Sequence, residues 1–200
     1  MLNSDNNLDA DESFHLALKY MNQGDQEAAI LHLKNVLDDK PGHGQAMYLL
    51  GALHADLGMY ERATEELTKA VEMVPEINAA HFQLGLLHAM SGDVDNAISA
   101  WEALKSRSDS DPYRIFASGL EKLCDDDFEG AAAKLKHGLS INSENDALNE
   151  DMARILAEIN STTSQTIGVD ESPTSEAQSK ESVSKMFLAA YQQDNDSDPN

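Results

Sequence analysis

The sequence is poor in basic residues and has almost no cysteine. It contains 14 lysines and arginines against 36 aspartates and glutamates, which gives a formal net charge of −22. Because nucleic acids and anionic membrane surfaces attract positive charge, this balance speaks against both as partners. The single cysteine, Cys124, excludes an internal disulfide framework and is typical of a reducing compartment.

Long apolar runs are also missing. No run approaches the roughly 18 residues that a membrane-spanning helix needs. The N-terminal stretch MLNSDNNLDADES has neither the positive region nor the apolar region of a signal peptide. We therefore expect a soluble, cytoplasmic protein that does not insert into a membrane.

What the sequence does contain is a repeat with a period of 34 residues. Four aromatic residues follow this period, at Phe14, Tyr48, Phe82 and Phe116. Small residues follow it in two further columns: Ala17, Gly51, Gly85, Gly119 and Ala29, Ala63, Ala97, Ala131. Turn-forming glycines recur at Gly24, Gly58 and Gly92. Since 34 residues is the length of one helix–turn–helix repeat, the pattern predicts a stack of such repeats.

The second unit carries the pattern most fully, in AMYLLGALHADLGMYERATEELTKAVEMVP. In this order of small, aromatic, small, bulky and proline positions the chain resembles the tetratricopeptide repeat family, in particular its small bacterial members. The resemblance covers about residues 10–145 and implies an all-α fold, a right-handed superhelical α-solenoid of about four helix–turn–helix repeats plus a capping helix. The repeats are expected at 10–43, 44–77, 78–111 and 112–145. Ser118 and Gly138 stand at packing columns filled elsewhere mostly by Leu or Val, which indicates a looser fourth repeat.

Composition predicts the segments that flank the repeats. Residues 1–9 are polar and expected to be flexible. Residues 146–160 carry one apolar stripe and are expected to form a capping helix over the last repeat. Residues 161–180, rich in serine and threonine, are expected to be a disordered linker. A short amphipathic helix is expected at 181–192, and a disordered tail at 193–200.

The aromatic column begins a second apolar stripe on the first helix of each repeat. It is distinct from the stripe expected to pack inside the repeat, for example Leu50, Gly51 and His54. The resemblance implies that first helices line a concave surface on which partners bind. The alternative is that the aromatics only wedge neighbouring first helices together. The predicted groove residues are Phe14, Leu18, Met21, Tyr48, Ala52, Phe82, Leu86, Phe116, Leu120 and Leu123.

The predicted groove lacks the basic and amide side chains with which some family members hold a C-terminal carboxylate. Leu18, Ala52, Leu86 and Leu120 stand at those positions. An apolar ligand is therefore favoured, such as an amphipathic helix or an extended segment. The chain carries a candidate itself in the stripe Val183, Met186, Phe187 and Tyr191. This stripe either fills the groove of its own chain or of a second copy, or docks on another protein, or has no role.

Catalytic and metal-binding residue patterns are weak. His54 and His88 share a column near His81, but Tyr20 and Lys122 fill that column in other repeats, which favours packing over metal binding. Three aspartates follow Cys124 and should raise the pKa of its thiol, which disfavours a nucleophile. We therefore expect no enzyme activity, no metal and no cofactor.

The sequence thus favours a protein-interaction scaffold or adaptor that binds an apolar helix or segment of a protein partner. A first alternative is a secretion-type chaperone for a hydrophobic client. Class II chaperones of bacterial type III secretion are similar small acidic tetratricopeptide proteins, although this chain has four repeats instead of three and an added tail. A second alternative is a structural self-association module, with a homodimer formed through the groove or the tail.

Overall fold

The computed structural model describes residues 8–166 and 183–191 of the 200-residue chain. Within these two ranges the regular structure is helical, and they contain no strand. The chain divides into two compact units, Met1–Ala80 and His81–Asn200. The division falls in the first turn of helix α5 (Asn78–Met90). The two units are described separately.

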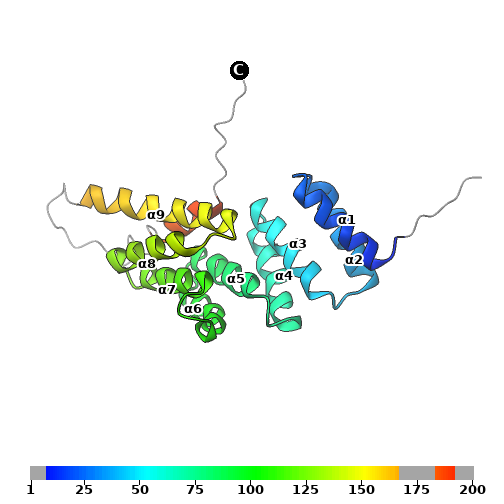
Figure 1. The fold of residues 1–200 in the computed structure, drawn as a ribbon, viewed down its shortest axis with the longest axis horizontal. Helices are drawn as coiled ribbons and strands as arrows, with labels where there is room; N and C mark the ends of the chain where they lie inside the picture. The colour runs from blue at the N-terminus through cyan, green and yellow to red at the C-terminus, as the bar shows by residue number, and fades with distance from the viewer. Residues whose placement is uncertain (1–7, 167–182, 192–200) are drawn as a thin grey trace, which may run out of the picture. The chain divides into compact units, whose positions relative to one another are not determined.

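The first unit contains two antiparallel helix pairs (Figure 1). They are α1 (Ala10–Asn22) with α2 (Gln26–Asp39), and α3 (Gly44–Asp56) with α4 (Tyr60–Met73). Helix α2 also packs against α3, which joins the two pairs. Ala17, Leu33 and Leu50 lie in the resulting core, each at most 4% exposed.

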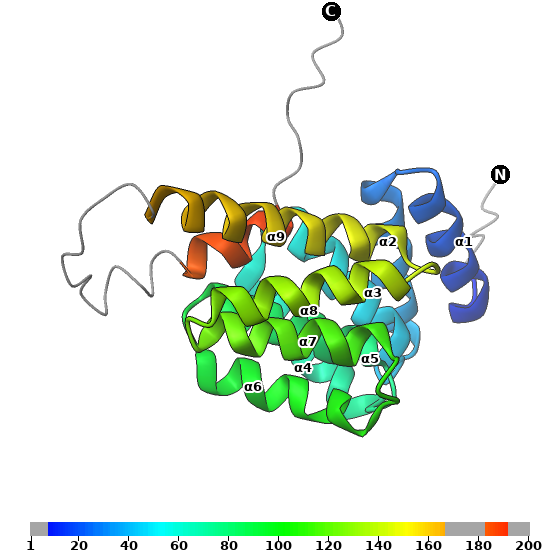
Figure 2. The ribbon, with the colours of Figure 1, turned by 60° about the vertical axis from the view of Figure 1, so that its left-hand side comes forward.

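The second unit continues the pairs and adds a further helix. The pairs are α5 with α6 (Val94–Glu102), and α7 (Pro112–Cys124) with α8 (Phe128–Ile141). A short 3-10 turn, η1 (Ala103–Ser106), extends α6. Helix α9 (Asp146–Thr166) packs against α8. Residues 183–188 are helical and lead into a second 3-10 turn, η2 (Ala189–Tyr191), which lies beside α9 (Figure 2).

The 34-residue period of the sequence is also the period of the helices. First helices begin at Ala10, Gly44, Asn78 and Pro112, and second helices at Gln26, Tyr60, Val94 and Phe128. Helix α9 begins at Asp146, one further period on, where a fifth repeat would start. The predicted all-α helical repeat fold is therefore confirmed.

Side chains at the helix ends explain why the chain turns where it does. Asp9, Asp25, Asp93, Asp111 and Asp127 each cap a helix by accepting a backbone N–H of its first turn. Within the first three pairs the turn passes through a glycine with positive φ: Gly24 at 73°, Gly58 at 73° and Gly92 at 81°. In the fourth pair Asp126 holds the corresponding position at φ 59°, a conformation that aspartate tolerates better than most residues.

The structure corrects two predicted segment ends. Asp9, assigned to a flexible N-terminus, forms a capping box with Glu12 at the start of α1. Residues 161–166 of the predicted linker belong to α9, because this helix continues to Thr166. The hydroxyls of Thr163 and Ser164 donate to carbonyls four residues earlier, so these polar side chains have their partners on the helix itself. The rest of the predicted flexible and disordered segments, at 1–7, 167–180 and 193–200, lies outside the described residues, as do residues 181, 182 and 192 of the predicted amphipathic helix.

Candidate interaction surfaces

Five of the predicted groove residues lie on α1 and α3 of the first unit and are partly exposed, and we call them together the α1–α3 surface. Leu18 is 37% exposed, and the others are half-buried. The residues are Phe14, Leu18, Met21, Tyr48 and Ala52.

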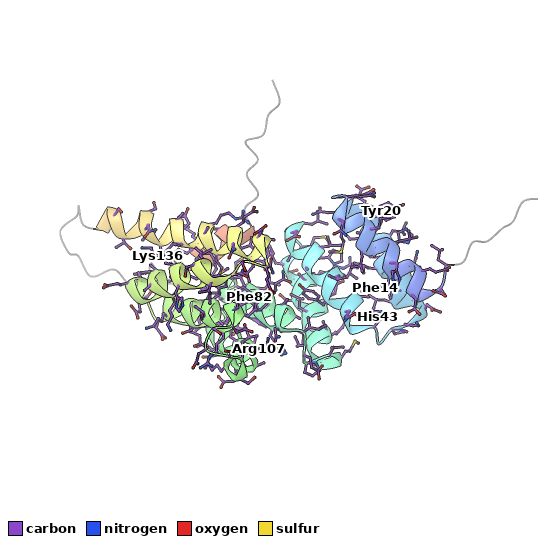
Figure 3. The ribbon with its side chains drawn as sticks, in the orientation of Figure 1. Phe14, Tyr20, His43, Phe82, Arg107 and Lys136 are labelled. Carbon is purple, nitrogen blue, oxygen red and sulfur yellow. The ribbon has the colours of Figure 1, made fainter. Side chains whose placement is uncertain are left out.

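The edge of this surface is held by the start of α3. The ring centroid of Phe14 lies 4.7 Å from that of His43 (Figure 3). His43 in turn accepts the backbone N–H of Ala46 through Nδ1, at 3.1 Å. Phe14 and Met21 also pack against the core of the unit. Phe14 and Met21 therefore pack against the core on one side and are partly open to solvent on the other.

The other five predicted groove residues are buried in the second unit. Phe82, Leu86, Phe116, Leu120 and Leu123 are at most 2% exposed. The Phe82 ring meets Tyr113 edge-on at 5.6 Å, and the Phe82 carbonyl accepts the indole N–H of Trp101 at 3.1 Å. In this unit the predicted residues make core contacts, as in the packing alternative.

The interpretation of the aromatic column as separate from packing within a pair is wrong for Phe116. A Cβ added to Gly138 of α8 would overlap the ring of Phe116 on α7. The ring occupies the space that a side chain at position 138 would take, and it is fully buried. For the same reason Gly138 does not mark a loose repeat, because the partner helix fills the gap.

A second glycine, Gly85, leaves space for the side chain of Trp101, the only tryptophan of the chain. A Cβ on Gly85 of α5 would overlap the indole of Trp101 on α6. Trp101 is fully buried, while the same column holds leucine in the other three repeats. The close approach of the indole to α5 also aligns its N–H with the Phe82 carbonyl.

The C-terminal segment 183–191 lies against the second unit and contacts α5, α6 and α9. The Phe187 ring lies 6.3 Å from that of Trp101, measured between centroids. The Ser184 hydroxyl donates to the Met90 carbonyl at 2.5 Å. Arg154 of α9 donates to the Ala190 carbonyl at 3.2 Å. Five apolar side chains of the segment are at most 7% exposed, namely Val183, Met186, Phe187, Ala189 and Ala190, while Leu188 is half-buried.

Of the four predicted ligand residues in this segment, three are buried and Tyr191 is half-buried. Sequence reasoning did not identify Ser184, Met90 or Arg154 as contacts. The Met90 contact is made by a backbone carbonyl, which does not depend on the type of side chain. In the sequence, Arg154 is one polar residue of the predicted capping helix, with nothing to distinguish it as a contact.

The titratable groups considered for chemistry have local partners. His54 Nδ1 donates to Glu66 Oε2 at 2.5 Å inside the first unit, and Arg62 also approaches Glu66, at 3.3 Å. His88 Nδ1 lies 3.6 Å from Asp93 Oδ2 in the second unit. In the part of the chain that the structure describes, no group of three or more histidine, cysteine or acidic residues is arranged to hold a metal ion.

Burial raises the pKa of the Cys124 thiol to about 12, and the negative charges of Asp125, Glu121 and Asp126 act in the same direction. Because the thiolate is the reactive form, a pKa this high disfavours Cys124 as a nucleophile near neutral pH. Across residues 8–166 and 183–191, no helix is both long and apolar enough to cross a membrane.

The fold is that of a class of helical repeat proteins with many solved members. MamA from Desulfovibrio magneticus RS-1, from residue 41 to its end, is 18% identical, with a TM-score of 0.58 over 92% of this chain and 97% of that one. A thermophilic TPR protein from Thermus thermophilus is 16% identical, with a TM-score of 0.61 over 90% and 99%. YrrB, described as a TPR protein with an unusual peptide-binding site, is 16% identical, with a TM-score of 0.57 over 96% and 90%.

At these identities the likeness shows the fold alone. Residues 20–87 match the family model for the tetratricopeptide repeat. The chain therefore matches the tetratricopeptide repeat by sequence over these residues, and it shares the fold of solved tetratricopeptide repeat proteins. No sequence among the curated proteins matches it.

Proposed function

We propose that this protein is a non-enzymatic interaction scaffold that binds an apolar helix or extended segment of a protein partner. The tetratricopeptide fold supports the general part of the proposal, because stacked helical repeats present extended surfaces to other proteins. The observation that carries the specific part is the segment 183–191. It is itself an apolar helical segment, and it rests on the second unit with five buried apolar side chains.

The α1–α3 surface is the part of the predicted groove that is open to a partner. Phe14, Leu18 and Met21 follow one another at i, i+4 and i+7, so they lie along one face of α1. An apolar helix binds such a row through side chains at the same spacing. The 37% exposure of Leu18 leaves apolar area for a partner to cover.

The second unit supports a different role, in which the chain occupies its own surface. Each large apolar side chain of segment 183–191 contributes roughly 1.5–3 kcal/mol when buried, before the cost of ordering the segment. Because the segment is tethered, its effective concentration is on the order of millimolar. A partner for the second unit would therefore have to compete with the C-terminal segment of the chain itself.

Four forms of the full-length protein test the proposal: wild type, Leu18→Asp, Phe187→Asp and the control Leu31→Asp. Leu31 is 59% exposed on α2, outside both sets of groove residues, so it matches the apolar-to-acidic change. Each form is immobilised on a resin and incubated with lysate of the native host. Bound proteins are then identified by mass spectrometry.

We expect a partner that binds wild type and Leu31→Asp, is lost with Leu18→Asp, and carries an apolar helix or segment. Phe187→Asp, which puts a charge at a fully buried position, should release the C-terminal segment and raise binding of partners to the second unit. If all four forms retain the same proteins, neither surface is an interaction site and the proposal fails.

A further inference from the structure

Two polar contacts hold segment 183–191 near its opposite ends, and they have consequences for what else can bind there. One lies at Ser184, close to the start of the segment, and the other at Ala190, in its last turn. Apolar burial alone tolerates a helix that is reversed or shifted by a turn. A donor and an acceptor at fixed positions do not, because a reversed helix would place neither group correctly.

The contact near the start of the segment is made to the Met90 carbonyl, at the end of α5. Met90 is the last residue of that helix, where carbonyls lack a partner within the helix. The Ser184 hydroxyl donates to this carbonyl although the two residues are 94 positions apart. A hydroxyl in the first turn of the bound segment therefore satisfies a group that the fold leaves open.

The contact at the far end uses a charged donor from α9. Arg154 Nη2 donates to the Ala190 carbonyl, and the same nitrogen lies 2.5 Å from Asp151, one turn earlier on α9. The aspartate holds the guanidinium in place, and a hydrogen bond from a charged donor is stronger than one between neutral groups. Arg154 thereby binds a backbone carbonyl in the last turn of the segment.

Between and beside these contacts, two large and two small apolar side chains of the segment are buried. Met186 and Phe187 are adjacent large residues, at most 1% exposed, and Phe187 faces the Trp101 indole. Ala189 and Ala190 are buried at 4% and 3% exposure in the turn that contacts α9. Small side chains at these two positions let the backbone of the turn approach α9.

We propose that the surface formed by Met90, Trp101 and Arg154 binds amphipathic helices in one direction and one register. Its partner helices repeat the chemistry of 183–191: a hydroxyl side chain in the first turn, an adjacent pair of large apolar residues, and two small residues at the end. This inference rests on the proposed function, since it names the class of ligand for a surface that the chain itself occupies.

The test uses full-length Phe187→Asp as the receptor and a fluorescein-labelled peptide of residues 181–192 as the probe. Binding is followed by fluorescence anisotropy and, with unlabelled peptide, by the emission of Trp101, the only tryptophan. We expect saturable binding that shifts the Trp101 emission to shorter wavelength. Wild-type protein should bind the peptide more weakly, because its own segment competes. A scrambled peptide of the same composition is the control.

Direction and register are tested by removing each polar contact. The peptide Ser184→Ala should bind about fivefold more weakly, and the receptor Phe187→Asp/Arg154→Met about tenfold more weakly. A peptide with an ester in place of the amide between residues 190 and 191 carries a weaker acceptor at the Ala190 carbonyl. Its loss of affinity should be large with Arg154 and small with Arg154→Met, since the two changes remove the same bond.

The outcomes separate the two proposals. If the peptide binds but Ser184→Ala, the ester, the scrambled order and Arg154→Met leave affinity unchanged, the inference on direction and register is overturned while the proposed function stands. If Phe187→Asp leaves the Trp101 emission unchanged and no peptide binds, self-occupancy of the second unit is wrong, and the inference falls with it.

Discussion

The ring of Phe116 lies against the backbone of Gly138, in the space where a side chain at position 138 would stand. Three other repeats fill the corresponding position with Val36, Ala70 and Leu104. In the fourth pair this space is filled by the Phe116 ring of the first helix, α7, instead of by a side chain of the second helix, α8. This exchange of a large and a small side chain between the two helices keeps the core filled. Phe116, a residue of the predicted groove, therefore packs within its own helix pair.

This exchange predicts that Gly138→Ala destabilises the protein. Alanine favours a helix interior by about 0.8–1.0 kcal/mol over glycine, but overpacking a filled core costs about 1–3 kcal/mol. Because the added Cβ would overlap the Phe116 ring, the overpacking cost falls in the upper half of that range. We therefore expect the free energy of unfolding in urea to fall by about 1–2 kcal/mol. The double variant Gly138→Ala/Phe116→Leu should recover part of the loss.

The matched control is Gly42→Ala, since no atom lies within 4 Å of a Cβ at that position and its φ is not positive. Its unfolding free energy should be unchanged or slightly higher. Equal stability of Gly138→Ala and wild type would show that the Phe116 ring does not fill this space.

The helical repeat could be predicted from sequence because its signals are local and recur with one period. Gly24, Gly58 and Gly92 marked three turns, and the fourth, at Asp126, lies one period further on. Helix α9 extends beyond its predicted end through residues rich in serine and threonine, and the hydroxyls of Thr163 and Ser164 bond back to carbonyls of the same helix. Composition alone does not distinguish such a helix end from a linker.

The state of the candidate site was harder to predict. The spacing of Phe82 and Leu86 shows that one face of α5 is apolar, but not what covers it. Segment 183–191 reaches α5 through Ser184 and a carbonyl 94 residues away, and α6 through the Phe187–Trp101 contact. Such pairings follow from the three-dimensional path of the chain and leave no periodic trace in the sequence.

Glu66 should be important for the stability of the first unit. It accepts a hydrogen bond from His54, whose side chain is only 2% exposed. Glu66→Ala leaves the His54 N–H buried without this partner, and we expect the free energy of unfolding to fall by about 1–3 kcal/mol. Replacing both residues, as in His54→Leu/Glu66→Leu, should cost less than the single change, because no polar group is then left unpaired.

The neighbouring Glu65→Ala serves as the control for this experiment. Glu65 is exposed on the same helix, so its loss should change stability by no more than about 0.5 kcal/mol. Similar losses for Glu65→Ala and Glu66→Ala in urea unfolding would argue against a specific role for the His54–Glu66 bond.

The exposed pair between Asp11 and Lys40 predicts a measurable pKa change with little effect on stability. The hydrogen bond from Lys40, at 2.8 Å, lowers the pKa of Asp11 below its ordinary value of 3.8. The stabilisation from this pair is present above pH 3.8 and is lost as the pH falls through the lowered pKa. Lys40→Met should therefore raise the pKa of Asp11, measured by NMR titration of its carboxyl carbon, while stability near neutral pH changes little.

Lys34→Met, a change of the same type at an exposed position of α2, should leave the Asp11 titration unchanged. An Asp11 pKa that does not respond to Lys40→Met would mean that the two side chains are not paired in solution.

Cys124 should react slowly with alkylating reagents in the folded protein. With a pKa of about 12, only about one thiol in ten thousand is ionised at pH 8, against roughly a quarter of free cysteines. The higher pKa makes the thiolate intrinsically more nucleophilic and offsets about half of that difference on a logarithmic scale. We therefore expect alkylation by iodoacetamide to be on the order of a hundredfold slower than in urea-unfolded protein. The rate in the folded state should also keep rising above pH 9, where that of a free cysteine levels off. Alkylation at the unfolded rate, or a plateau near pH 9, would show that burial and the neighbouring carboxylates do not hold the proton on this thiol.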